Sequence, residues 1–198
     1  MKITLNTNLL IIAALTVTMA LSSCESNTAE ANKETPTETA EDSNEAKFNG
    51  VEEKKADYLV DIAAANLSII KLSELAEQKT TNDKVKLFAT KMIAKHKKIS
   101  GDINGLAASK NITIPEDMAF TEADGYKDIS SETGLEFDKD YSDQISKQHQ
   151  DFINKLDTTN SNYNDAMVKK FIDEQLPKLR THIDESIVLK KYLDGLKK

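Results

Sequence analysis

The stretch VKLFATKMIAKHKKISGDINGL, residues 85–106, repeats its apolar side chains at alternating spacings of three and four. This spacing is typical of one face of an α-helix, because three or four residues make about one turn. The stripe consists of Val85, Phe88, Met92, His96, Ile99, Ile103 and Leu106. Residues 80–83 offer N-cap side chains, so the pattern predicts a helix that begins there and ends near Lys110. His96 therefore lies on a face that we expect to be buried.

Three further segments have the same periodicity. The first predicts a helix over residues 52–79, with a stripe at Leu59, Ile62, Asn66, Ile69, Ser73 and Ala76. The second is marked by Phe137, Tyr141, Ile145, His149, Phe152 and Leu156. After a polar cluster at residues 158–164, the third follows with Val168, Phe171, Gln175, Leu179, His182, Ser186, Leu189 and Leu193. Pro177 should kink this last helix, because proline has no N–H to donate.

Residues 111–131 contain Pro115 and Gly125 and are too irregular for a full helix, so we expect a crossover loop, with or without a short helix. The second and the fourth of these helices open alike, with Asn-Asp before a Val-Lys-x-Phe run, which indicates a duplicated hairpin. The sequence thus predicts an all-α four-helix bundle of two helical hairpins joined by a long crossover loop. Both a ferritin-like order and a simple up-down-up-down order fit this length.

The N-terminal 23 residues have the features of a signal peptide, namely Lys2 and an apolar run over residues 9–21. The peptide Leu21-Ser22-Ser23-Cys24 closes the run and resembles the lipobox of bacterial lipoproteins, whose cysteine thiol receives a diacylglycerol before cleavage. The alternative is an ordinary signal peptide that happens to contain the chain's one cysteine. We therefore predict lipidation at Cys24 and attachment to a membrane through that lipid.

Residues 24–50 are polar and acidic without apolar periodicity, so we expect a disordered tether ahead of a domain over residues 51–198. The formal net charge of −7 disfavours nucleic acid as a partner. The chain has neither a Gly-rich phosphate loop nor a nucleophile elbow, and we assign no catalytic residue.

The three histidines, His96, His149 and His182, all fall on predicted buried stripes. A divalent metal site is one interpretation, because neutral imidazoles are common ligands and bundle interiors hold such sites. Counted from a turn near residue 161, His149 and His182 differ by roughly 13 Å in height, which argues against one ion shared by all three. In a ferritin-like order His96 and His149 could meet near Asn66.

The other interpretation is that the histidines are core polar groups. Iron-carboxylate bundles need a Glu three residues before each ligating His, and Ile93 and Leu179 stand there in this chain. Asp138 and Tyr141 are expected level with His182, where they could satisfy it, as Asn66 could satisfy His96. We expect this core role, and no cofactor, ahead of a metal site.

Two groups of residues resemble a bacterial envelope family of predicted outer-membrane proteins with a ferritin-like domain of unknown function. The first half matches in Ala63-Ala64-Ala65 and in Val85-Lys86-x-Phe88-Ala89-x-x-Met92-Ile93-x-x-His96. The second half matches in Phe137-Asp138-x-x-Tyr141, His149 and Leu176-Pro177-x-Leu179-x-x-His182. The resemblance covers residues 56–194 and implies the ferritin-like order and an outer-membrane location, without an activity. Where family members carry acids, this chain has Ile69 and Lys95, which weakens the case for iron.

These observations favour a noncatalytic, lipid-anchored envelope module that binds an envelope protein or a small ligand, or contributes to stress responses. A ferritin-like metal-binding protein or oxidoreductase that uses the core histidines is the alternative. A third hypothesis is a pH-responsive module, because buried histidines would have to become charged on acidification.

Overall fold

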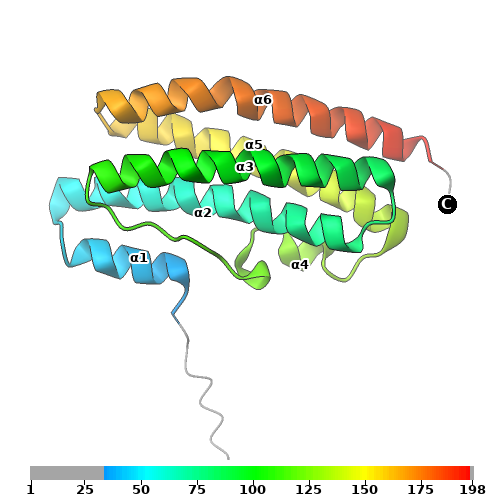
Figure 1. Cartoon of the computed structure of the whole chain (residues 1–198), viewed down its shortest axis with the longest axis horizontal. Coiled ribbons are helices and arrows are strands. Elements are labelled where there is room, and N and C mark those ends of the chain that lie inside the picture. The colour runs from blue at the N-terminus through cyan, green and yellow to red at the C-terminus, as the bar shows by residue number, and fades with distance from the viewer. Residues whose placement is uncertain (1–33, 197–198) are drawn as a thin grey trace, which may run out of the picture. The chain divides into compact units, whose positions relative to one another are not determined.

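The computed structural model describes residues 34–196, which fold into helices without any β-strand. Four long helices form a bundle: α2 (Gly50–Lys79), α3 (Asp83–Ser109), α5 (Gly134–Asn162) and α6 (Ala166–Asp194), as Figure 1 shows. The predicted all-helical bundle is confirmed. None of the helices in this part of the chain is both long and apolar enough to span a membrane. The predicted signal peptide, Cys24 and the tether up to residue 33 lie outside the described residues.

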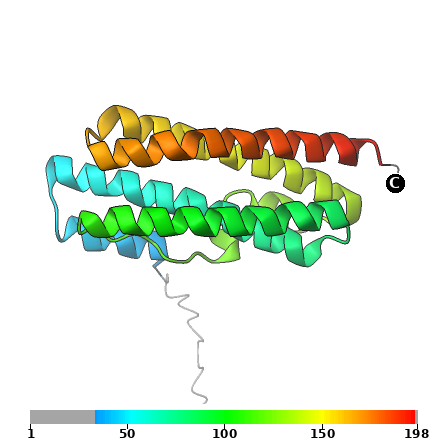
Figure 2. The ribbon, with the colours of Figure 1, turned by 45° about the horizontal axis from the view of Figure 1, so that its top comes forward.

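The long helices pair as two hairpins. Helix α2 packs on α3 and α5 packs on α6, while α2 also contacts α5 and α3 lies beside α6 (Figure 2). Helices α3 and α6 start with the same type of cap, because the side chains of Asn82 and Asp165 each accept two backbone N–H groups of the first turn. The two similar openings seen in the sequence are therefore equivalent helix starts.

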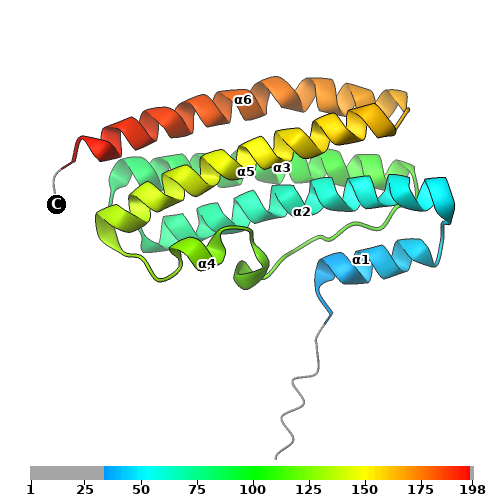
Figure 3. The ribbon, with the colours of Figure 1, turned by 180° about the vertical axis from the view of Figure 1, so that it is seen from behind.

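The crossover runs the length of the bundle (Figure 3). At one end Lys110, just after α3, pairs with Asp165, just before α6, over 2.5 Å. At the other end the Thr80 hydroxyl, just after α2, donates to Asp138 near the start of α5 over 2.7 Å. Between them the chain contains the 3₁₀ turn η1 (Phe120–Glu122) and the short helix α4 (Tyr126–Ile129). Helix α5 is therefore parallel to α3 and antiparallel to α2.

The core lies between the four long helices and is made largely of the predicted stripes. The largest side chains that are fully buried include Phe137, Tyr141, Phe152, Leu59, Ile69 and Met92. Burial of each large apolar side chain stabilises the fold by about 1.5–3 kcal/mol. Helix α6 contains Pro177 and continues helical beyond it to Asp194.

The predicted tether is wrong for residues 36–45, which form helix α1 (Pro36–Glu45) against α2. Thr35 and Glu38 make a capping box at its start. Near its end the buried Asn44 side chain donates to the Thr113 carbonyl over 2.7 Å and accepts from the Thr113 N–H over 2.8 Å. The helix buries only Ala40 and Asn44, so it has no apolar stripe that periodicity could detect.

Candidate metal centre

The three histidines come from three helices and meet in the middle of the bundle. His96 lies near the centre of α3, His149 near the centre of α5 and His182 near the centre of α6. His96 and His149 are fully buried, and His182 is 5% exposed. Asn66 reaches the same level from α2. All four long helices thus contribute one polar side chain to one buried cluster.

The prediction that His149 and His182 are too far apart in height to share an ion was wrong. His149 Nε2 lies 3.0 Å from His96 Nε2 and 3.3 Å from His182 Nδ1. Helix α5 continues into the predicted polar cluster as far as Asn162, and the turn follows at residues 163–165. Measured from residue 164, His149 is 15 residues back and His182 is 18 residues on, a difference of roughly 4.5 Å in helical rise.

A hydrogen bond to Asn66 sets the tautomer of His96. The Asn66 amide nitrogen donates to the His96 carbonyl over 3.1 Å and to the Ser100 hydroxyl over 2.7 Å. A carbonyl can only accept, so the other amide atom, 2.8 Å from His96 Nδ1, is the oxygen. In neutral His96 the proton therefore lies on Nδ1, and Nε2 has a free lone pair.

The backbone sets the tautomer of His149 in the same way. Its Nδ1 lies 2.7 Å from the Ile145 carbonyl oxygen, one helical turn earlier. Because that oxygen can only accept, Nδ1 carries the proton and Nε2 is unprotonated in the neutral ring. Two lone pairs, on His96 Nε2 and on His149 Nε2, consequently face each other across 3.0 Å.

Protonation of a histidine does not relieve this contact near neutral pH. Burial holds the pKa of His96 well below its usual range, and the neighbouring His149 and His182 lower it further. Burial also lowers the pKa of His149 to about 3, although the hydrogen bond to the Ile145 carbonyl opposes this. All three rings are therefore neutral at pH 7, which is the form of histidine that binds metals.

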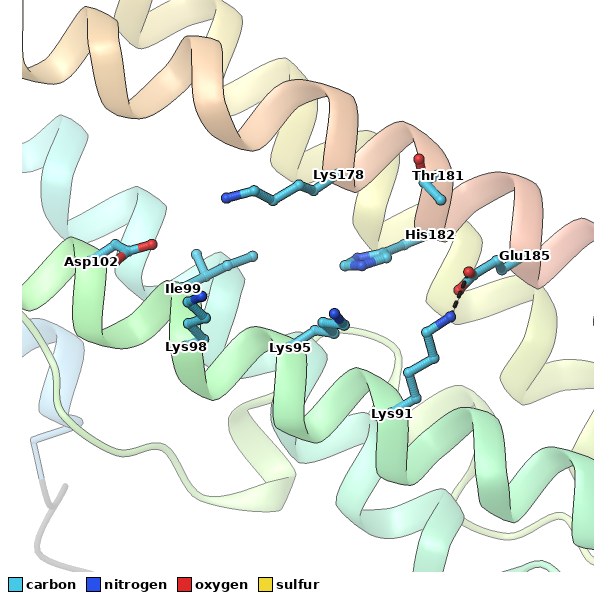
Figure 4. A pocket seen from close by; sticks show the side chains of 9 residues that line it. All are labelled: Lys91, Lys95, Lys98, Ile99, Asp102, Lys178, Thr181, His182 and Glu185. Carbon is cyan, nitrogen blue, oxygen red and sulfur yellow. Dashed lines mark hydrogen bonds and ion pairs between the residues drawn. The ribbon is translucent and has the colours of Figure 1, made fainter.

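Of the three rings in the cluster, only that of His182 borders a surface cavity. This side chain lines a cavity of about 270 Å³ between α3 and α6, and Figure 4 shows it between residues of both helices. Burial lowers the pKa of His182 to about 4 against the opposing effect of Glu185, while Lys91, Lys95 and Lys178 lower it further. His182 is therefore the member of the cluster that borders this cavity.

The three histidines could hold a single transition-metal ion. Zinc binds histidine nitrogen at about 2.0–2.1 Å, so two ligands of a tetrahedral ion are roughly 3.3–3.4 Å apart. The observed spacings of 3.0 and 3.3 Å are close to this, and all three ligand nitrogens lie within 4.8 Å of one another. Ligating histidines usually donate their other N–H to a carbonyl or carboxylate, as His96 and His149 do here to Asn66 and Ile145.

Residues 38–188 match the model of a family described as "Domain of unknown function (DUF4142)". The chain belongs to this family. The match covers all three histidines and begins within α1, which agrees with α1 being part of the folded domain. No curated protein and no solved structure gives a significant match to the chain.

In this DUF4142 domain Asp138 and Tyr141, the two predicted partners of His182, lie away from the histidine cluster. Asp138 accepts from the Thr80 hydroxyl over 2.7 Å, and Tyr141 donates to the Ser73 hydroxyl over 3.1 Å. Both lie in the first turns of α5, towards the end of the bundle. The turn between α5 and α6 comes later in the sequence than predicted, which places His182 level with His149 and away from Asp138 and Tyr141. Burial raises the pKa values of Asp138 and Tyr141 above their usual ranges.

The sequence did not predict the other groups that surround the histidine cluster of this DUF4142 domain. The Ile145 carbonyl carries no sequence signal, because every residue has one. Lys95 and Lys98 had no predicted role in a site, whereas they line the cavity next to His182. Their position on the same side of α3 as Ile99 and Asp102 was the available signal, together with Lys178 four residues before His182.

Proposed function

We propose that this DUF4142 protein binds one divalent transition-metal ion through His96 Nε2, His149 Nε2 and His182. The observation that carries the proposal is the pair of unprotonated Nε2 atoms that face each other at 3.0 Å in a buried site. A cation between them removes the repulsion of the two lone pairs and uses the donors that Asn66 and Ile145 have already oriented. Metal binding thus replaces partner binding as the first hypothesis.

The ligand set favours zinc or another nitrogen-binding ion such as copper. Imidazole suits Zn²⁺, Cu²⁺ and Ni²⁺, whereas iron-carboxylate centres need several Asp or Glu ligands. Within the described part of the chain, the histidine group contains no carboxylate. Three histidine ligands leave the fourth position of a tetrahedral zinc open, as in zinc sites that bind a water or another small ligand. In residues 34–196 the histidine group therefore lacks the carboxylate ligands of an iron-carboxylate centre.

The proposal includes a ferritin-like order for the bundle. It is supported by two antiparallel hairpins, by the parallel run of α3 and α5, and by a crossover that spans the length of the bundle. This order puts His96 and His149 at the same height, since both helices run from one end of the bundle to the other in the same direction.

We further propose that the protein is anchored by lipid on Cys24 to the outer membrane of a bacterial cell envelope. The support is the positive start at Lys2, the apolar run over residues 9–21 and the peptide Leu21-Ser22-Ser23-Cys24. Mass spectrometry of the N-terminal peptide from expressing cells tests it. A mature chain that begins at diacylated Cys24 is expected, and a chain cleaved elsewhere or carrying an unmodified thiol contradicts it.

Elemental analysis of the full chain, purified in detergent without chelator, tests the metal centre. About one zinc or copper ion per chain is expected after reloading, because one group of three ligands is present. The double variant His96→Ala, His149→Ala should lose the ion. His182→Gln is a milder second variant at the edge of the cavity, and Tyr141→Phe is the control because it alters a buried hydrogen bond away from the cluster. Metal-free protein after reloading, or metal retained by every histidine variant, overturns the proposal.

A further inference from the structure

The cavity beside His182 has a local charge opposite to that of the chain. Its lining includes four lysines, Lys91, Lys95, Lys98 and Lys178, but only two acids. The chain as a whole has a formal net charge of −7. Figure 4 shows the lysines of α3 and Lys178 of α6 on either side of the space in front of His182. This excess of cations is concentrated around one hollow of about 270 Å³.

The two acids of the cavity do not neutralise its lysines. Glu185 pairs with Lys91 over 2.5 Å, so these two charges neutralise each other in the lining of the cavity. The Asp102 carboxylate accepts from the Gln175 amide over 3.4 Å, and Lys178 donates to the Gln175 amide oxygen over 3.1 Å.

Three ammonium groups thus remain without an acidic partner. Among residues 34–196, no carboxylate lies within ion-pair distance of Lys95, Lys98 or Lys178. By contrast, Lys97 on the same helix is 3.2 Å from Glu74. Lys95, Lys98 and Lys178 all line one cavity, and a group of unpaired ammonium groups around one hollow fits an external anion.

The proposed metal centre needs an anion for its own charge. Three neutral imidazoles contribute no negative charge, so a bound divalent ion keeps its full positive charge in a buried site, which is unfavourable unless an anion accompanies it. His182 belongs both to the histidine cluster and to the cavity wall. An anion in the cavity would therefore lie next to the one histidine of the proposed centre that lines the cavity.

We propose that this cavity binds a small oxyanion such as phosphate, held by Lys95, Lys98 and Lys178 in front of His182. The part of the inference that concerns the metal rests on the proposed function, whereas the lysine site stands on its own contacts. The anion is attracted by the ammonium groups and, when the ion is present, by the metal charge. Its affinity should fall with added salt, because the cavity is open to solvent and surface charges are screened over roughly 8–10 Å at physiological ionic strength.

Isothermal titration calorimetry of inorganic phosphate into the full chain in detergent tests the proposal. Phosphate should bind the metal-free and the zinc-loaded protein, and more tightly the latter. Lys95→Gln with Lys98→Gln should weaken binding about tenfold or more, because two charged contacts to the anion are lost. The matched control is Lys86→Gln with Lys97→Gln, which removes two exposed lysines of the same helix outside the cavity and should leave binding unchanged.

The outcomes separate the two proposals. Phosphate binding that depends on Lys95 and Lys98 in a protein that takes up no metal supports the anion site and refutes the metal centre. Metal uptake without phosphate binding overturns the anion site alone. An equal loss in the cavity variant and in the control variant also overturns it, because the effect is then one of net charge.

Discussion

His96 and His149 approach each other through the two nitrogens that carry no proton. The Asn66 oxygen holds the Nδ1–H of His96 at 2.8 Å, and the Ile145 carbonyl holds that of His149 at 2.7 Å. Because both N–H groups are directed outwards, neither His96 nor His149 donates to the other. This arrangement suits the proposed metal centre, because neither ring has to lose a proton when an ion binds.

Asn66→Ala tests this orientation. The substitution leaves the His96 Nδ1–H and the His96 carbonyl without their partner and is expected to lower the free energy of unfolding by about 1–3 kcal/mol. Zinc affinity should fall by roughly 10–100-fold, as is common when an oriented ligand loses its outer hydrogen bond. Urea unfolding and competition with a chromophoric chelator measure the two effects. Unchanged affinity in the variant would show that Asn66 does not orient a ligand.

Tyr141→Phe provides the comparison for that variant. It removes the buried hydrogen bond to Ser73 and should cost about 0.5–1.5 kcal/mol of stability, the usual worth of such a bond. Tyr141 does not contact the histidine cluster through any hydrogen bond in the described structure, so zinc affinity should stay the same. A parallel loss of affinity in both variants would mean that metal binding reports only the stability of the bundle.

The stability of the metal-free protein should depend on pH. The folded-state pKa values of His149 and His182 are lowered to about 3 and about 4, from an ordinary value of 6.5, and that of His96 is lowered as well. Between these values and 6.5 the unfolded chain binds more protons than the folded one, so stability is fully present above about pH 6.5 and is lost as the pH falls. The loss should be about 1 kcal/mol per histidine between pH 6.5 and 5.5.

Urea unfolding with chelator at pH 7.5, 6.5 and 5.5 measures this dependence. Lys91 and Lys95 from α3 and Lys178 from α6 face His182 and act in the same direction as burial, while Glu185 opposes them. His182→Gln should therefore keep about two thirds of the dependence. A free energy of unfolding that is flat over this range would contradict neutral buried histidines in the folded state.

Periodicity predicted the four long helices, because a long apolar stripe marks one face of each. For a ferritin-like order, counting residues along these helices predicted that His96 and His149 could meet near Asn66. The position of His182 depended on where one turn lies. Thr158, Ser161 and Asn162 are polar and looked like a loop, but their side chains donate to carbonyls four residues back within α5. A later turn lengthens the first helix and shortens the second. Moving it by about three residues therefore changes the relative height of two antiparallel helices by the rise of about six residues. Sequence alone therefore left the third ligand misplaced.

The start of the domain was misplaced for a different reason. Helix α1 holds its place through Asn44, whose amide makes two hydrogen bonds with the backbone of Thr113 in the crossover. Contacts of this kind join residues about 70 positions apart and follow no local pattern, so a polar segment was interpreted as a tether. The charge and composition of residues 34–50 are those of a linker, while the buried Asn44 makes their end part of the fold.

Asn44→Ala should release α1 from the crossover. The substitution removes both hydrogen bonds and leaves the Thr113 N–H and carbonyl to find other partners, so we expect a loss of about 1–3 kcal/mol in the free energy of unfolding. Because α1 lies on the outside of α2 and does not touch the histidine cluster in the described structure, metal affinity should not change. Hydrogen exchange should show faster opening of residues 36–45 in the variant than in Glu45→Ala, which alters a neighbouring exposed side chain. Equal exchange in the two variants would mean that Ala40 and the contacts of α1 with α2 hold this helix without Asn44.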